Sequence, residues 1–370
     1  MIHNKLIGQP LQQILAITRR HWDRPEVRPP VREAFVKILN CRTPALGAEV
    51  YASDTEEKSF CHTCKSAFCP GCGHRATQLW QRQQWAALPD MPYAGIVLTM
   101  PHFLWPIFQQ NRHLLHDLPA VGAAAIQALA KAKCGVRVLV MVVQHTFGRQ
   151  LNFHPHLHVL VSAGGMQESE GRWIAHLHFD KRELMEMWRF AVIAYLWRAL
   201  RAKIFTFSMG SDKLTVMLKA QYKRSWNIHI DHFKSKRQFL RYAGRYIRRP
   251  PIDQNRFVKV TDEEVLFRTK DLKQKRVVIT RYSTEHFIDL LADHVRERYQ
   301  HAMRYFGLLA PGSKRKTSEA MFVALGQKRR SPPKRLGWRI SLLRDFERDP
   351  LVDSQGQRMR WARRVKSLAR

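Results

Sequence analysis

Residues 154–161 have the sequence His-Pro-His-Leu-His-Val-Leu-Val, in which histidines alternate with other residues before an apolar run. Side chains in a β-strand alternate between its two faces, so His156 and His158 are predicted to share one face. The apolar run Val138–Val143 predicts another strand, over residues 136–145. Residues 146–152 between these strands suit a hairpin connection.

Further apolar patterns predict strands and helices before and after this hairpin. Hairpin-joined strands interrupted by helices predict an α+β fold with a mainly antiparallel sheet flanked by helices. We expect further strands over residues 93–99, 226–231, 256–260, 265–269 and 276–281. We expect helices over residues 31–39, 114–133, 181–203, 234–249 and 284–305.

A third histidine is predicted to join the first two. If the two strands pair about a midpoint near Leu151, His145 lies opposite His156 on the same face. Three imidazoles then converge and leave coordination positions for water and a phosphate oxygen. Gln144 replaces His145 if the register slips. Imidazole favours Mn, Zn, Co or Ni over Mg, although a phosphate ligand makes Mg or Mn usable. The alternative is a solvated polar face of the sheet.

The expected helix 234–249 contains Tyr242-Ala243-Gly244-Arg245-Tyr246. Residues four apart share a helix face, so Tyr242 and Tyr246 can offer two phenols to one place. Tyrosine has a pKa near 10 and needs nearby cations to become a useful nucleophile. The arginines around the pair supply such cations and are candidate contacts for DNA phosphates: Arg241, Arg245, Arg248 and Arg249. The alternative is a pair of core aromatic residues beside Phe239.

Attack of a tyrosine on a phosphodiester keeps the bond energy in a phosphotyrosyl link that can be resealed without ATP. Two tyrosines permit two successive transfers. Asn227, His229 and Asp231 share one face of the expected strand 226–231 and could orient a ligand histidine. Solvated polar residues are the alternative for that group.

The charge balance indicates a polyanionic partner. The 370 residues include 63 Lys and Arg against 30 Asp and Glu, a formal net charge of +33. Nucleic acid is the usual partner of such a chain, and a ribosomal or membrane-surface protein is the alternative. No segment has the length of a membrane span, and residues 1–17 lack a signal-peptide core. We therefore expect a cytoplasmic protein that acts on DNA or RNA and does not bind membrane.

Four clustered cysteines predict a zinc site. Cys61-x-x-Cys64 and Cys69-x-x-Cys72 offer four thiolates at the spacing of zinc ligands. His62, His74 or Cys41 could replace one of them, and buried reduced cysteines are the alternative. We expect a helical and zinc-binding N-terminal module over residues 1–80, a catalytic domain over 85–310 and a loosely ordered basic tail over 311–370.

Three segments together resemble a known family. Residues 151–159 with Gly164-Gly165, residues 242–246, and residues 304–309 resemble the rolling-circle transposases of bacterial insertion sequences of the IS ninety-one kind. These enzymes are HUH endonucleases, related to plasmid relaxases and replication initiators. The resemblance covers most of residues 35–310.

The resemblance implies an HUH-nuclease-like fold, with His156 and His158 as metal ligands and Tyr242 and Tyr246 as nucleophiles. It implies an enzyme that uses Mg or Mn and nicks single-stranded DNA at element ends and target, leaving a 5′-phosphotyrosine and a free 3′-hydroxyl. It also implies a nucleoid-associated protein of the bacterial cytoplasm. The family's zinc ribbon has an earlier Cys-x-x-Cys pair that residues 50–54 lack, so the zinc ligand set stays open. A replication initiator, a relaxase, and a non-catalytic zinc DNA-binding protein are the alternatives.

Overall fold

The computed structural model describes residues 9–167, 169–204, 210–247, 250–271, 276–331, 333–334, 336–347 and 349–367. They fall into two compact units. The first unit comprises the described parts of residues 1–76, 250–295 and 332–370, and the second those of 77–249 and 296–331. None of the helices formed by the described residues combines the length and apolarity that a membrane span requires.

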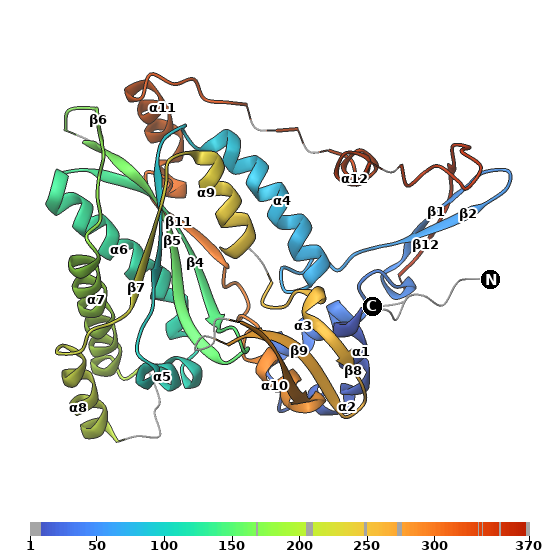
Figure 1. Ribbon diagram of the computed structural model, residues 1–370, viewed down its shortest axis with the longest axis horizontal. Helices are drawn as coiled ribbons and strands as arrows, with labels where there is room; N and C mark the ends of the chain where they lie inside the picture. The colour runs from blue at the N-terminus through green and yellow to red at the C-terminus, as the bar shows by residue number, and fades with distance from the viewer. Residues whose placement is uncertain are drawn as a thin grey trace. The chain divides into compact units, whose positions relative to one another are not determined.

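The second unit is built on an antiparallel sheet with the strand order β11-β4-β5-β3-β7, to which β6 adds beside β5 (Figure 1). Its strands are β3 (Tyr93–Leu98), β4 (Arg137–Phe147), β5 (Phe153–Gln167), β6 (Arg172–Ala175), β7 (Ile228–Phe233) and β11 (Met303–Gly307). The centre of β4 is buried on both faces because its apolar run supplies side chains to two separate cores.

Helices cover both faces of this sheet. The helices of the second unit are α4 (Pro70–Ala87, which begins in the first unit), α5 (Trp105–Gln110), α6 (Leu114–Cys134), α7 (Lys181–Arg201), α8 (Ser211–Gln221), α9 (Lys236–Tyr242) and α11 (Lys314–Ala324). Short 3₁₀ turns occupy His102–Leu104 and Pro311–Ser313. Polar caps fix two starting points: Asp180 accepts hydrogen bonds from the first turn of α7, and Ser235 from that of α9.

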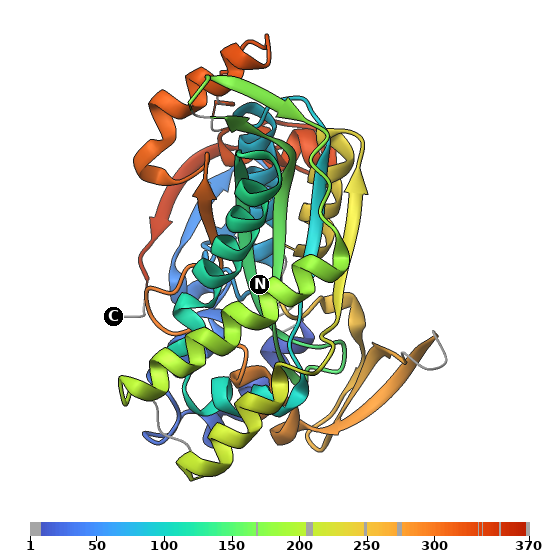
Figure 2. The ribbon, with the colours of Figure 1, turned by 90° about the vertical axis from the view of Figure 1, so that its left-hand side faces the viewer.

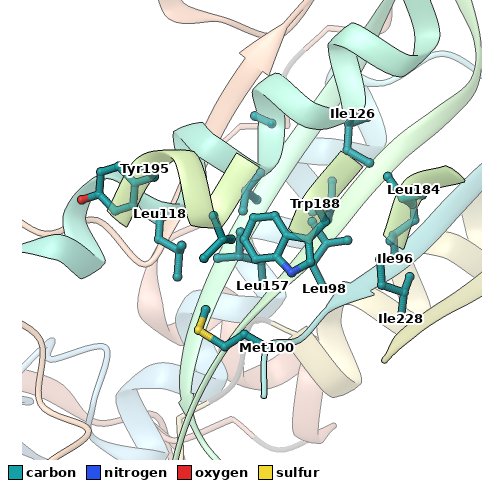
Figure 3. Packing of buried hydrophobic residues seen from close by; sticks show 14 of the residues in the cluster. Ile96, Leu98, Met100, Leu118, Ile126, Leu157, Leu184, Trp188, Tyr195 and Ile228 are labelled. Carbon is teal, nitrogen blue, oxygen red and sulfur yellow. The ribbon is translucent and has the colours of Figure 1, made fainter. Parts of the chain in front are cut away.

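One face of the sheet packs against α6 and α7, which lie in front of the strands in Figure 2. Trp188 of α7 is fully buried against Leu98 and Leu157 at the centre of this core (Figure 3). Its indole Nε1 donates a hydrogen bond of 2.7 Å to the carbonyl oxygen of Thr99. The polar edge of this buried indole is therefore satisfied.

The opposite face packs against α4 and α9 (Figure 1). Trp80 of α4 and Phe239 of α9 are buried there with Met141 and Leu160 of the sheet. Phe239 stacks on Tyr93, with ring centroids 4.3 Å apart. Because side chains alternate between the two faces along β4 and β5, His145, His156 and His158 lie on this same face.

The first unit contains two three-stranded antiparallel sheets, of order β12-β1-β2 and β10-β9-β8. Their strands are β1 (Ala48–Ala52), β2 (Glu57–Cys61), β8 (Phe257–Val260), β9 (Glu264–Lys270), β10 (Val277–Ser283) and β12 (Arg360–Val365). Its helices are α1 (Pro10–Ile17), α2 (Arg19–Trp22), α3 (Pro29–Leu39), α10 (Thr284–Ala292) and α12 (Trp338–Phe346), with 3₁₀ turns at Pro44–Leu46 and Gln254–Arg256.

Two regions differ from the sequence-based expectation. The helix expected over 284–305 ends at Ala292, and its second half contains β11. Tyr299 has a φ of 64°, a left-handed conformation that no α-helix continues through. The expected loose tail instead contains α11, α12 and β12. Strand β12 pairs with β1, and Nη1 of Arg363 lies 2.7 Å from Oε2 of Glu57 on β2. Basic residues of this segment thus form ion pairs within the protein.

The units also divide the chain differently from the expected boundaries at residues 80–85 and 310–311. Residues 250–295 were expected in the catalytic domain, yet they cluster with the N-terminal helices. Arg28 carries part of this contact, because its guanidinium donates to the carbonyl oxygens of Ala292 and Val295. Contacts between segments so distant in the chain leave no local pattern in the sequence.

Candidate catalytic and zinc sites

The hairpin β4–β5 brings three histidines together. His145 is paired directly with His156, and His158 is paired with Val143. One ligand atom from each of His145, His156 and His158 lies within 4.8 Å of the others. This is the register expected from the sequence. Gln144 faces the other way and accepts a hydrogen bond of 3.0 Å from Gln300.

The environment of these rings suits metal binding. His145 and His156 are 5% and 8% exposed. The Nδ1 of His156 lies 2.8 Å from the carbonyl oxygen of His154, which orients the ring and turns its Nε2 toward the Nε2 of His158, 3.2 Å away. Burial, then the neighbouring His158 and His154, lower the pKa of His156 well below its usual value. The ring is therefore neutral, the form that binds metals.

His154 lies beside this cluster without joining it. Strand β5 begins at Phe153, so His154 points to the same face as His156, with ring centroids 4.8 Å apart. Its ring also lies 4.6 Å from that of Trp105, and burial lowers its pKa. Its backbone carbonyl contacts His156, whereas its imidazole is outside the group of converging ligand atoms.

The two tyrosines lie at and just beyond the end of α9, which packs on the face of the sheet that carries the histidines. Helix α9 ends at Tyr242, and Ala243–Ile247 continue it as a π-helical segment. The two tyrosine rings have centroids 5.4 Å apart. The ring of Tyr242 contacts Phe233, at 4.9 Å between centroids, whereas Tyr246 is 47% exposed. A π-segment between two candidate nucleophiles is notable because such segments are frequent at functional sites.

Two residues that the sequence did not single out position this segment. A Cβ on Gly95 of β3 would lie 3.2 Å from Cε1 of Tyr242, so the ring of Tyr242 lies directly over a glycine of the sheet. The Nε2 of Gln81, on α4, donates a hydrogen bond of 2.8 Å to the carbonyl oxygen of Leu240. An isolated glycine inside an apolar strand was the available sign of a close approach at Gly95.

The arginines near the tyrosines are only partly described. Arg241 and Arg245 are exposed, and the guanidinium carbon of Arg245 lies 5.9 Å from the ring centroid of Tyr246. Arg248 and Arg249 lie outside the described residues. On β7, the Nε2 of His229 lies 3.0 Å from Oδ1 of Asp231, so these two candidate orienting residues contact each other.

Four cysteines converge in the first unit, and their membership differs in one position from the expected quartet. The converging thiols belong to Cys41, Cys64, Cys69 and Cys72. The Sγ atoms of Cys41 and Cys72 are 3.7 Å apart, as are those of Cys64 and Cys72, while those of Cys41 and Cys69 are 3.8 Å apart. Zinc–sulfur bonds of about 2.3 Å at tetrahedral angles give sulfur separations of about 3.8 Å. The donor set therefore fits zinc.

Cys41 replaces Cys61 for a structural reason. Cys61 is the last residue of β2 and pairs with Ala48, which keeps it in the hairpin and out of the thiol cluster. Cys41 follows the end of α3. The buried side-chain amide of Gln12 donates to the carbonyl oxygens of Ile38, Leu39 and Cys41, which fixes that end. Cys41 was one of the substitutes that the sequence left open.

Comparisons with known proteins cover the parts of the chain that contain both clusters. A family model described as a putative transposase matches residues 140–317, and one described as a transposase zinc-binding domain matches residues 13–100. The chain is 33% identical to the transposase for insertion sequence element IS801 of Pseudomonas savastanoi pv. phaseolicola, over 75% of this chain and 70% of the relative.

It is 29% identical to the putative transposase y4qJ of Sinorhizobium fredii, over 75% of this chain and 74% of the relative. No solved structure is significantly similar to the chain. Two family models and two relatives thus agree on one kind of protein, and the chain belongs to the IS91-type family of insertion-sequence transposases.

Proposed function

We propose that this chain nicks and rejoins single-stranded DNA in rolling-circle transposition, through 5′-phosphotyrosine links to Tyr242 and Tyr246. One observation carries the proposal: the histidine cluster and Tyr242 lie over the same face of one sheet. His158 pairs with Val97 of β3, and the ring of Tyr242 covers Gly95, two residues along the same strand. Two residues of a strand span roughly 7 Å, which brings a phenol and a metal site within reach of one phosphodiester.

His145, His156 and His158 would hold a divalent ion, Mg or Mn in our proposal. A bound ion of this kind polarises a non-bridging phosphate oxygen and offsets charge in the transition state. The residues fit this role because their imidazoles converge and His156 is oriented by a backbone carbonyl. Open coordination positions distinguish such a site from the four-thiol cluster, in which every ligand comes from the protein.

The proposed chemistry uses the tyrosines in turn. The phenolic oxygen of one tyrosine attacks phosphorus, the bond from phosphorus to the 3′ oxygen breaks, and the phosphate stays on the protein. The free 3′-hydroxyl can prime synthesis or attack the link again, which releases the tyrosine and reseals the strand. A second tyrosine allows a second strand to be cut while the first link persists.

Single-stranded DNA at the element ends and at the target is the proposed substrate. The exposed Arg241 and Arg245 lie beside the tyrosines and would contact its phosphates, and we assign the same role to Arg248 and Arg249. The net charge of +33 favours such a substrate through counterion release. We propose the nucleoid of the bacterial cytoplasm as the place of action, because the substrate lies there.

The experiment that tests this function mixes the full chain with Mn or Mg and end-labelled single-stranded oligonucleotides from the flanks of its own gene. Label that stays on the protein in a denaturing gel measures the covalent link. We expect an adduct with the unaltered chain, and none with the double variant Tyr242→Phe plus Tyr246→Phe or with His156→Ala.

The outcomes separate the alternatives. An adduct that persists in the double tyrosine variant would mean another nucleophile, and would overturn the proposal. A chain that binds these oligonucleotides tightly but forms no adduct with any of them would instead act as a non-catalytic DNA-binding protein.

A further inference from the structure

Asp231 lies on the face of the sheet that carries the histidine cluster. In the register of β7 with β3, Asp231 pairs with Gly95, and Gly95 pairs on its other side with Leu160 of β5. The ring of Tyr242 covers Gly95, since a Cβ there would lie 3.2 Å from Cε1 of Tyr242. Tyr242 is therefore held above the sheet with Asp231 as its neighbour on β7.

The Asp231 carboxylate connects two further groups. Its Oδ1 lies 3.0 Å from Nε2 of His229, and its charge acts on the phenol of Tyr242, whose ring covers the glycine paired with Asp231. The Asp231 carboxylate therefore has both Tyr242 and His229 as neighbours on this face of the sheet. Burial, and then the Asp231 carboxylate, raise the pKa of Tyr242 to about 12. The phenol is therefore protonated at neutral pH and must lose its proton as it attacks.

We propose that Asp231, held in place by His229, accepts the phenolic proton of Tyr242, and that Tyr242 therefore makes the first strand cleavage. This inference rests on the proposed function and adds the route of the proton and the order of the tyrosines. As the bond from the phenolic oxygen to phosphorus forms, the proton moves to Asp231. The electron pair of the breaking bond leaves with the 3′ oxygen, which takes a proton from water. When the link is resealed, Asp231 returns its proton to the phenol.

Tyr246 has a different environment. Its side chain is 47% exposed, and among the described residues it contacts the Tyr242 ring and the Arg245 guanidinium. It lies in the π-helical segment, four residues beyond the tyrosine that the sheet holds. The geometry thus gives Tyr242 a carboxylate partner and leaves Tyr246 facing solvent, where a second strand can be received.

The test measures the single-turnover rate of adduct formation in two backgrounds. In a Tyr246→Phe chain, where only Tyr242 can react, Asp231→Asn should lower the rate about 100-fold or more, the range of general base catalysis. In a Tyr242→Phe chain, where only Tyr246 can react, the same change should alter the rate less than about threefold, since a general base contributes only to the tyrosine it serves. Equal effects in both backgrounds, or none in the first, would overturn the inference.

Two further variants separate proton transfer from loss of structure. Asp231→Glu keeps the carboxylate and should retain more activity than Asp231→Asn. Difluorotyrosine at position 242 has a more acidic phenol, so it should recover part of the rate lost in Asp231→Asn. Failure of both to raise the rate above that of Asp231→Asn would assign Asp231 a purely structural role. Glu186→Gln is the matched control and should leave the rate unchanged, because the Glu186 side chain is exposed on α7, which packs on the other face of the sheet.

The two proposals fail in different ways. If the unaltered chain forms no adduct, the proposed function fails. If the unaltered chain forms an adduct and the Asp231→Asn rate in the Tyr246→Phe background is unchanged, only the role of Asp231 is refuted. An adduct that forms faster in Tyr242→Phe than in Tyr246→Phe would reverse the proposed order of the tyrosines.

Discussion

Lys236, in the first turn of α9, extends its ammonium group to within 3.0 Å of the Asp90 carboxylate. The same Nζ donates to the carbonyl oxygens of Trp85 and Leu88, at 2.9 Å and 2.7 Å. The lysine side chain is only 2% exposed. It therefore joins the beginning of the tyrosine-bearing helix to the end of α4, and both elements pack on the face that carries the histidines.

Lys236→Met should destabilise the second unit while keeping the apolar stem packed. The carbonyl oxygen of Leu88 loses this donor, and that of Trp85 keeps only a bond of 3.5 Å from Arg330. A buried unsatisfied group costs about 1–3 kcal/mol. Asp90→Asn should cost less, because that side chain is 52% exposed and is also paired with Arg330. Urea unfolding of the two variants checks the order. A Lys236→Met chain as stable as the unaltered one would show that this contact does not hold α9.

Gly244→Ala should distort the turn between the two tyrosines. A Cβ there would lie 2.0 Å from Nε2 of Gln81, the atom that donates to the carbonyl oxygen of Leu240. Overpacking of this kind typically costs about 1–3 kcal/mol. Gln81→Ala removes the obstructing side chain, so the double variant should lose less stability than the two single changes added together. Gly312→Ala, where a Cβ would have nothing within 4 Å, is the matched control in thermal unfolding.

Cys41→Ser should remove zinc from the chain, whereas Cys61→Ser should leave the zinc content unchanged. The two cysteines differ in place: Cys41 lies 3.7 Å from Cys72, Sγ to Sγ, and Cys61 lies outside the thiol cluster on β2. Binding of structural zinc contributes directly to folding, so Cys41→Ser should also lower the melting temperature. Zinc measured by elemental analysis of the two purified variants checks this. Equal zinc loss in both would return Cys61 to the ligand set.

The convergence of the three histidines was predictable because local rules determine it. Alternation of side chains along a strand places His156 and His158 on one face. The hairpin midpoint near Leu151 places His145 opposite His156, and the two residues are paired in the structure. The place of Cys41 in the thiol cluster was harder to predict, because Cys41 and Cys64 are 23 positions apart in the chain. Its place depends on how α3 ends against Gln12, a contact between segments distant in the chain.

The fold was predicted well where the apolar period was unambiguous, as in β4, β5 and α7. The segment after Ala292 was predicted wrongly as a continuous helix. It contains strand β11, which forms an edge of the sheet and pairs Tyr305 with Met141. Such an edge strand forms because a distant segment pairs with it, and its own sequence does not predict this. The pairing of Asp231 with Gly95 depends on strand order in the same way, so local rules predict only that His229 and Asp231 share a face.

His145→Ala should weaken binding of Mn to the second unit, and His154→Ala should not. Both rings lie close to His156, at centroid distances of 5.4 Å and 4.8 Å, so simple proximity would predict similar effects. The geometry separates them, because a ring nitrogen of His145 converges with those of His156 and His158, whereas His154 acts through its backbone carbonyl, which alanine keeps. Titration with Mn, followed by electron paramagnetic resonance on chain already loaded with zinc, measures the affinity without any DNA. If His154→Ala weakened binding as much as His145→Ala, the imidazole of His154 would be part of the site, and the ligand set proposed for catalysis would have to change.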